Sequence, residues 1–109
     1  MSTKDVEKVI THFVNKEEYS TAYEITTRLD EDEKNIVAKV ALKKGNLETM
    51  ALVCKQMHDA NDLRKIAISM IKMGLANTEF LYHINEQLKG RSPVAHKDIS
   101  LELIDLFSR

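Results

Sequence analysis

Gly45 divides the central apolar stretch of this chain, residues 36–57, into two segments, each with the spacing of one helical face. The apolar positions are Val37, Val40, Ala41 and the stem of Lys44 before the turn, and Leu47, Met50, Ala51, Cys54 and Met57 after it. Gly45 favours the left-handed conformation that ends a helix, and the side-chain oxygen of Asn46 is suited to cap the next one. The stretch 36–57 therefore predicts a tight antiparallel helix pair.

A similar pattern occurs on both sides of this pair. Tyr19 aligns with Leu47 at a step of 28 residues, and Gly45 aligns with Gly74 at a step of 29. A sustained period of this length is typical of helix-pair solenoids, in which stacked pairs build one continuous core. The alternative is that any chain of six helices with short turns shows some spacing of this kind. Both interpretations predict helices separated by short turns.

The expected fold is all-α, a single helical-repeat domain over residues 1–109 with six or seven helices in antiparallel pairs. It would form a short right-handed α-α superhelix or a compact helical bundle. We expect helix pairs at 3–29, 31–57 and 60–88, a linker at 89–97 and a C-terminal capping helix at 98–108. The expected caps are Ser2 or Thr3, Asp30 with Glu33, Asp59 or Asn61, Asn77 or Thr78, and Asp98, with Gly90 as a C-terminal stop. Ser92 before Pro93 offers a second start, for a short helical turn.

Composition limits the classes of function. The net charge of −1 over 109 residues supplies no global field to attract nucleic acid or an anionic membrane. The charged N-terminus and the lack of a long apolar run predict neither a signal peptide nor a membrane span. The single cysteine, Cys54, excludes an internal disulfide and favours a reducing compartment, which we expect to be the cytoplasm.

Catalytic and metal-binding patterns are weak in this sequence. The four histidines, His12, His58, His83 and His96, include no pair at a spacing of four on one helix. Cys54 falls on an apolar stripe, where burial would raise its pKa and leave the thiol inert. No glycine-rich phosphate loop or nucleophile beside a histidine and an acid occurs. We therefore predict no catalytic residue, no metal and no cofactor.

The central unit carries a resemblance to a known family. Ala38, Ala41, Gly45, Leu47 and Met50, in this order, resemble the tetratricopeptide repeat and its relatives, including the helical repeats of clathrin-like and vesicle-coat proteins. The resemblance covers roughly residues 4–88, with a period of 28 to 29 residues in place of 34. It implies a scaffold that binds peptides or other proteins.

The candidate binding residues are basic side chains that stacked first helices would place in neighbouring rows, together with one methionine before a turn. They are Lys39, Lys43, Arg64, Lys65, Lys72 and Met73. Such a ladder suits a protein or peptide partner with acidic groups. The alternative interpretations are a solvated face, a nucleic-acid-binding domain that uses the same basic patch, and self-association through an open end of the array.

Overall fold

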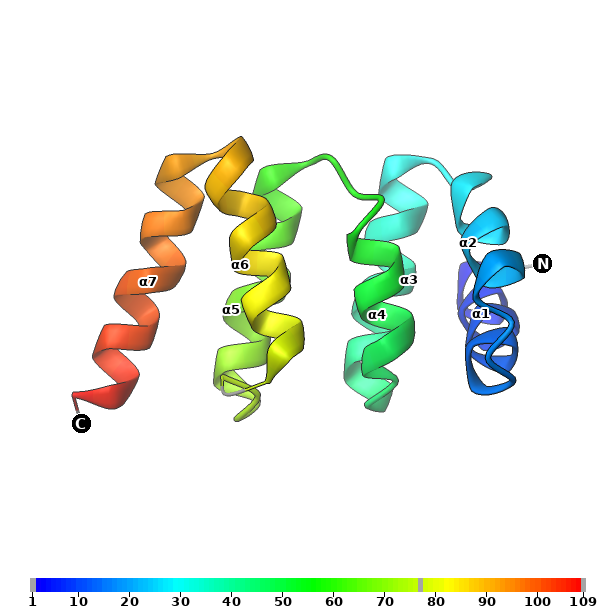
Figure 1. Cartoon of the computed structure of the whole chain (residues 1–109), viewed down its shortest axis with the longest axis horizontal. Coiled ribbons are helices and arrows are strands. Elements are labelled where there is room, and N and C mark those ends of the chain that lie inside the picture. Colours follow the sequence, from blue (N-terminus) through cyan, green and yellow to red (C-terminus); the bar gives the residue numbers. More distant parts are fainter. Residues whose placement is uncertain (1, 77, 109) are drawn as a thin grey trace. The chain divides into compact units, whose positions relative to one another are not determined.

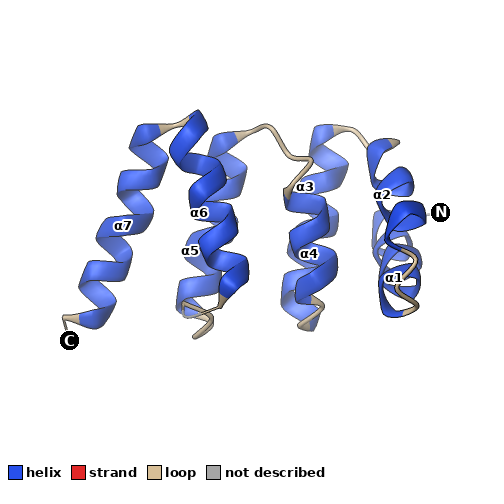
Figure 2. Cartoon of the chain, in the orientation of Figure 1, coloured by secondary structure: helices blue, strands red, loops and turns tan. Residues whose placement is uncertain are grey.

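The computed structural model describes residues 2–76 and 78–108, and within them the chain folds into seven helices (Figure 1). The helices are α1 (Thr3–Asn15), α2 (Tyr19–Thr27), α3 (Glu31–Lys44), α4 (Leu47–Cys54), α5 (Ala60–Lys72), α6 (Glu79–Arg91) and α7 (Pro93–Phe107). No strand occurs in the described residues, as the colouring in Figure 2 shows. The expected all-α class is therefore confirmed.

The chain divides into two compact units, residues 1–58 and residues 59–109. The first unit contains α1 to α4, and the second contains α5 to α7. Each unit is described by itself below. The single repeat domain and the right-handed superhelix stay predictions.

In the first unit, α1 packs against α2, α3 and α4, and α3 packs along α4. The buried apolar side chains include Ile10, Val14, Val37, Ala41, Met50, Val53 and Met57, of which Val37, Ala41, Met50 and Met57 belong to the stripes predicted on either side of Gly45. Small residues in α3 let the neighbouring helices approach closely, and methionines fill the remaining space. The predicted stripes therefore contribute to the core of this unit, while Val53, which lies outside them, is buried as well and Lys44 is exposed.

In the second unit, each of α5, α6 and α7 packs against the other two. The buried side chains at their meeting point include Leu63, Ile66, Met70, Leu81, Ile84, Leu88 and Ile99. Three helices around one core leave each helix with one face that its neighbours do not cover. The uncovered face of α7 carries large exposed apolar side chains.

Three helices end with the same backbone motif. Glu17, Gly45 and Gly74 adopt the left-handed conformation, with φ values of 61°, 81° and 81°. The amides of Glu18, Asn46 and Leu75 donate to the carbonyls of Phe13, Ala41 and Met70 at 2.9, 2.8 and 2.9 Å. These bonds satisfy carbonyls that the helix end leaves without an intrahelical partner. The steps between the three left-handed residues are 28 and 29, so the predicted period recurs at these helix ends.

Most predicted helix starts are confirmed. The side chains of Ser2, Asp59 and Thr78 accept backbone hydrogen bonds at the starts of α1, α5 and α6, and Asp30 forms a complete capping box with Glu33. Asn77, the alternative cap for α6, lies outside the described residues. The predicted cap at Asn46 is wrong, because its side chain makes no capping bond to α4.

The predicted linker at 89–97 is also wrong. Helix α6 continues through Gly90 to Arg91, and α7 begins at Pro93 instead of after Asp98. Ser92 is the cap, and its side-chain oxygen accepts from the amide of Ala95 at 3.2 Å. Pro93 occupies the first helical position, where its missing N–H costs no hydrogen bond. Two helices are also shorter than predicted. α2 ends at Thr27 instead of residue 29, and α4 ends at Cys54 instead of residue 57.

Candidate protein-interaction surface

The outward face of α7 carries a stripe of apolar side chains. We call Val94, Leu101 and Ile104, together with Lys97 between them, the outer stripe, because steps of three, four and three residues place these four positions on one helical face. Val94 is 72% exposed, Leu101 52% and Ile104 61%. Phe107, 65% exposed, lies beside this stripe. Four large apolar side chains of one 15-residue helix are therefore in contact with solvent.

The opposite face of α7 forms the contact with the rest of its unit. Ala95 and Ile99 are buried there. His96 Nδ1 lies 3.0 Å from Asn85 Oδ1 on α6, and Arg64 Nη1 on α5 lies 3.9 Å from Asp98 Oδ2. α7 is thus apolar on two sides, whereas a helix at the surface of a monomer normally has one apolar and one polar side.

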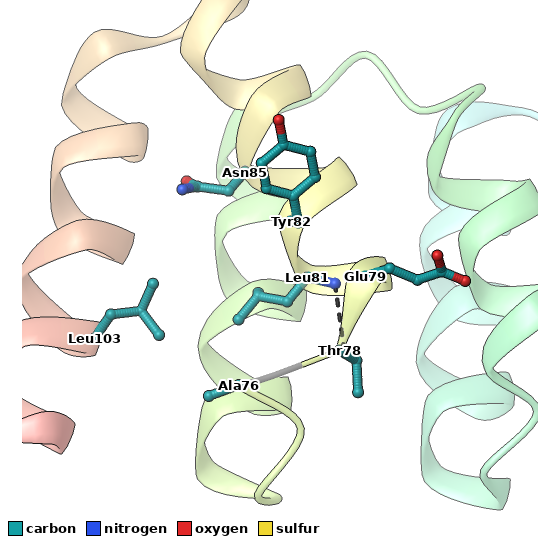
Figure 3. A pocket seen from close by; sticks show the side chains of 7 residues that line it. All are labelled: Ala76, Thr78, Glu79, Leu81, Tyr82, Asn85 and Leu103. Atoms are coloured by element: carbon teal, nitrogen blue, oxygen red, sulfur yellow. Dashed lines mark hydrogen bonds between the residues drawn. The ribbon is translucent and has the colours of Figure 1, made fainter.

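A cleft of about 450 Å³ adjoins this helix on the side of α6 (Figure 3). Its lining residues are Ala76, Thr78, Glu79, Leu81, Tyr82, Asn85 and Leu103. In the close-up, Leu103 of α7 and Leu81 of α6 point toward one another across the cleft, and Tyr82 stands at its edge. Tyr82 is 62% exposed. The cleft extends the apolar surface of α7 onto α6.

Acidic side chains border the outer stripe on the other side. Asp98, Glu102 and Asp105 follow one another at steps of four and three residues, so they share one flank of α7. We call these three residues the acidic flank. Glu102 and Asp105 are exposed, and Asp98 is the one that lies near Arg64. The helix therefore combines an apolar stripe with a negatively charged border.

The basic residues that the sequence singled out fall into two separate groups. Lys39 and Lys43 are exposed one turn apart on α3, in the first unit. Lys65 and Lys72 are exposed on α5, in the second unit. The ladder of five basic residues stays a prediction, because two of them belong to the first unit and three to the second.

Arg64 and Met73, the other two predicted residues, have different surroundings. Arg64 is half-buried, and its Nη2 donates to Asn61 Oδ1 at 3.0 Å. With Asp98 also close, its guanidinium is part of the packing between α5 and α7. Met73 follows the end of α5 and is 50% exposed, whereas Met50, Met57 and Met70 are buried.

A buried carboxylate in the first unit was missed by the sequence analysis. Glu7 of α1 is fully buried, and its oxygens accept hydrogen bonds from Thr11 Oγ1 at 2.6 Å, Lys44 Nζ at 2.9 Å and Asn46 Nδ2 at 3.0 Å. Since the Thr11 hydroxyl gives its only hydrogen to Glu7, Thr49 must donate in the 2.8 Å contact between the two threonines. Asn46, expected to cap α4, instead ties the α3–α4 turn to α1.

The electrostatics of Glu7 follow from these partners. Burial raises the pKa of Glu7, but the hydrogen bonds from Thr11, Lys44 and Asn46 and the charge of Lys44 outweigh burial, so the net pKa lies below the usual value of 4.5. All of its partners are side chains of the same unit. The arrangement is that of a structural carboxylate, paired with Lys44 and hydrogen-bonded within its own unit.

The predicted burial of Cys54 is confirmed, and two histidines lie against aromatic rings. Cys54 is buried, and burial raises the pKa of its thiol to about 12. The ring of His12 makes an edge contact with Phe13, and the ring of His83 makes one with Tyr82. Within residues 2–76 and 78–108, no three histidine, cysteine or acidic side chains come together as metal ligands. None of the helices in the described part of the chain has the length and apolar content needed to cross a bilayer.

No protein-family model, curated protein or solved structure matches this chain. The proposals below depend on its own residues and on their positions in the fold.

Proposed function

We propose that this chain is a non-catalytic protein–protein interaction module, which binds its partner on the outer stripe of α7 and the adjoining α6–α7 cleft. The observation that carries this proposal is the exposure of Val94, Leu101, Ile104 and Phe107 on one helix. Single exposed apolar residues are normal on a protein surface, but a contiguous group of them marks an interaction site.

The position of this group in the helix supports the proposal. A helix that closes a helical array needs a polar outer face to remain soluble. α7 instead places Val94, Leu101 and Ile104 outward while Ile99 fixes it to its own unit. Contact of the outer stripe with a helix or strand of another protein would therefore be more favourable than its contact with water. The cleft, with Leu81 and Leu103 at its walls, could accept a side chain of that partner.

This proposal keeps the general class that the sequence predicted and changes the surface. The basic residues Lys39, Lys43, Lys65 and Lys72 lie on exposed helix faces where long charged side chains are ordinarily solvated. Ion pairs that such exposed lysines form with a partner contribute little binding energy unless their geometry is well defined. The apolar surface of α7, in contrast, has an unfavourable contact with water that binding would remove.

The test is affinity capture from a lysate of the native cell with three matched proteins. These are the wild type, a Leu101→Gln, Ile104→Gln variant and a Lys39→Glu, Lys43→Glu variant, all with unchanged helical circular dichroism. We expect at least one protein that the wild type and the Lys39→Glu, Lys43→Glu variant capture and that the Leu101→Gln, Ile104→Gln variant does not. The same loss should then appear with the purified partner.

Two results would overturn the proposal. One is a set of captured proteins that is identical for all three forms. The other is capture of nuclease-sensitive nucleic acid that only the Lys39→Glu, Lys43→Glu variant loses, with binding that weakens steeply as salt is raised. The second result would establish the nucleic-acid-binding alternative.

A further inference from the structure

The chemistry of the partner can be argued from the charges that border the outer stripe. This inference rests on the proposed function of α7 and adds the kind of partner that the surface accepts. We infer that the outer stripe binds a basic amphipathic α-helix of another protein, with apolar residues at steps of three and four and lysine or arginine beside them.

The spacing of the outer stripe argues for a helical partner. The positions from Val94 to Ile104 follow the steps of three, four and three residues of a coiled-coil seam, with apolar side chains at three of them and Lys97 at the fourth. Such a seam is filled by a second helix whose apolar side chains insert between those of the first. An amphipathic helix offers apolar anchors at this spacing, and helix-in-groove recognition uses it in many complexes. Phe107 and the cleft wall at Leu103 widen the seam on one side.

The charges argue for a basic partner. Glu102 and Asp105 are exposed beside the apolar side chains, and Asp98 precedes them on the same flank. Lys97 is the one lysine or arginine of α7, and His96 lies against Asn85 of α6. A partner helix with lysine or arginine along the border facing this flank would gain favourable rim contacts, while an acidic partner would meet like charges.

The same charges argue against a second copy of this chain as the partner. In an antiparallel pair related by a two-fold axis, each flank meets itself, so Glu102 and Asp105 would face the acidic flank of the other copy. In a parallel pair, Lys97 would face Lys97 in the seam. Both arrangements bring like charges together, so the surface selects a different protein.

The experiment titrates the purified chain with three synthetic peptides of about 15 residues, matched to α7 in length. The first has Leu and Ile at heptad seam positions and Lys on both borders. The second replaces every border Lys with Glu. The third has the composition of the first in an order that abolishes the apolar stripe. We expect the Lys-bordered peptide to bind at least about tenfold more tightly than either of the others.

Charge-reversed variants locate the effect. Glu102→Lys, Asp105→Lys should reverse the preference between the Lys-bordered and Glu-bordered peptides, and Glu24→Lys, Glu48→Lys, on exposed positions of the first unit, should leave it unchanged. Leu101→Gln, Ile104→Gln should weaken binding of the Lys-bordered peptide by at least about tenfold.

The inference is overturned if the wild type prefers the Glu-bordered peptide, if none of the peptides binds, or if both charge-reversed variants behave alike. It is also overturned if sedimentation shows a dimer of the chain that Leu101→Gln, Ile104→Gln abolishes. These outcomes leave the proposed function standing whenever the lysate capture still depends on Leu101 and Ile104, so the failures of the two proposals can be distinguished.

Discussion

Glu7 in α1 and Leu101 in α7 depart from the usual pattern of an amphipathic helix in opposite directions. Glu7 is a charged side chain that is fully buried, and Leu101 is an apolar side chain that is half exposed. The partners of Glu7 all lie within its own unit, at hydrogen-bonding distance. The outer stripe around Leu101 lies instead on the side of α7 away from its buried Ile99. The first departure stabilises the fold, and the second leaves a surface for another molecule.

Substitutions at the two sites should therefore have different effects. A change at a residue that is satisfied inside the unit should affect stability, whereas a change at the outer stripe should affect binding and leave stability nearly unchanged.

The largest effect is expected on the inner face of α7. Ile99→Ala should lower the free energy of unfolding by about 3 kcal/mol, because Ile99 is fully buried and its loss leaves a cavity in the second unit. Urea denaturation followed by far-ultraviolet circular dichroism measures this change. Leu101→Ala, two residues away, is the matched control. Equal losses in the two variants would mean that α7 does not have distinct inner and outer faces.

Glu7→Ala should lower the free energy of unfolding by about 2 kcal/mol, because it removes a buried acceptor on which Lys44, Asn46 and Thr11 converge. The loss is smaller than for a fully buried ion pair, since Lys44 is partly exposed and can turn to solvent. The same denaturation measurement applies, with Glu24→Ala as the control for an exposed ion pair. If Glu7→Ala leaves the free energy of unfolding unchanged, this network does not stabilise the first unit.

The stability that Glu7 contributes should depend on pH. Its pKa is lower in the folded chain than in the unfolded chain, so the contribution is complete above the unfolded pKa, near 4.5, and is lost as pH falls through the folded pKa. Between about pH 7 and about pH 3, the wild type should therefore lose more stability than Glu7→Gln. Denaturation of both proteins at several pH values tests this. Parallel curves over the whole range would contradict it.

The smallest effect on stability is expected at the outer stripe. Leu101→Gln should change the free energy of unfolding by less than about 0.5 kcal/mol, because the side chain is already in contact with water. The variant should nevertheless lose partner binding. Thermal or urea denaturation measures the first quantity and affinity capture the second. A large loss of stability would place Leu101 in the core and remove the basis of the proposed function.

The sequence predicted those parts of the fold that depend on neighbouring residues. Asp30 and Glu33 form the expected capping box, and Gly45 and Gly74 end their helices in the expected conformation. Each of these features needs only a few adjacent residues. The apolar stripes on either side of Gly45 were predicted for the same reason, since their periodicity is a local property.

The Glu7 network could not be predicted in this way. Its partners Lys44 and Asn46 lie 37 and 39 residues away along the chain, and only the packing of α1 against α3 and α4 brings them together. Near the start of a helix, an acidic residue such as Glu7 is already accounted for by the helix dipole, so local spacing gives no sign of its burial. The side chain of Asn46 looked like a cap for the same local reason.

The outer stripe was not predicted because the start of the last helix was placed at residue 98 instead of Pro93. The Ser92–Pro93 step is compatible with a turn and with a helix start, and the expected linker placed Val94 and Lys97 outside any helix. With α7 beginning at Pro93, the steps from Val94 to Ile104 become one face of a continuous helix. The basic residues drew attention because charge is visible in a sequence, whereas exposure of an apolar side chain is decided by tertiary packing.

The central claim is that the partner contacts the outer stripe of α7, and site-specific photo-crosslinking tests it most directly. A photoreactive benzophenone amino acid would replace Leu101 in one protein and Lys43 of α3 in another, and both would be illuminated in a lysate of the native cell. We predict a discrete protein adduct at position 101 that is absent at position 43. Adducts that form at position 43 and not at position 101, or that contain nucleic acid, would contradict this account of the surface.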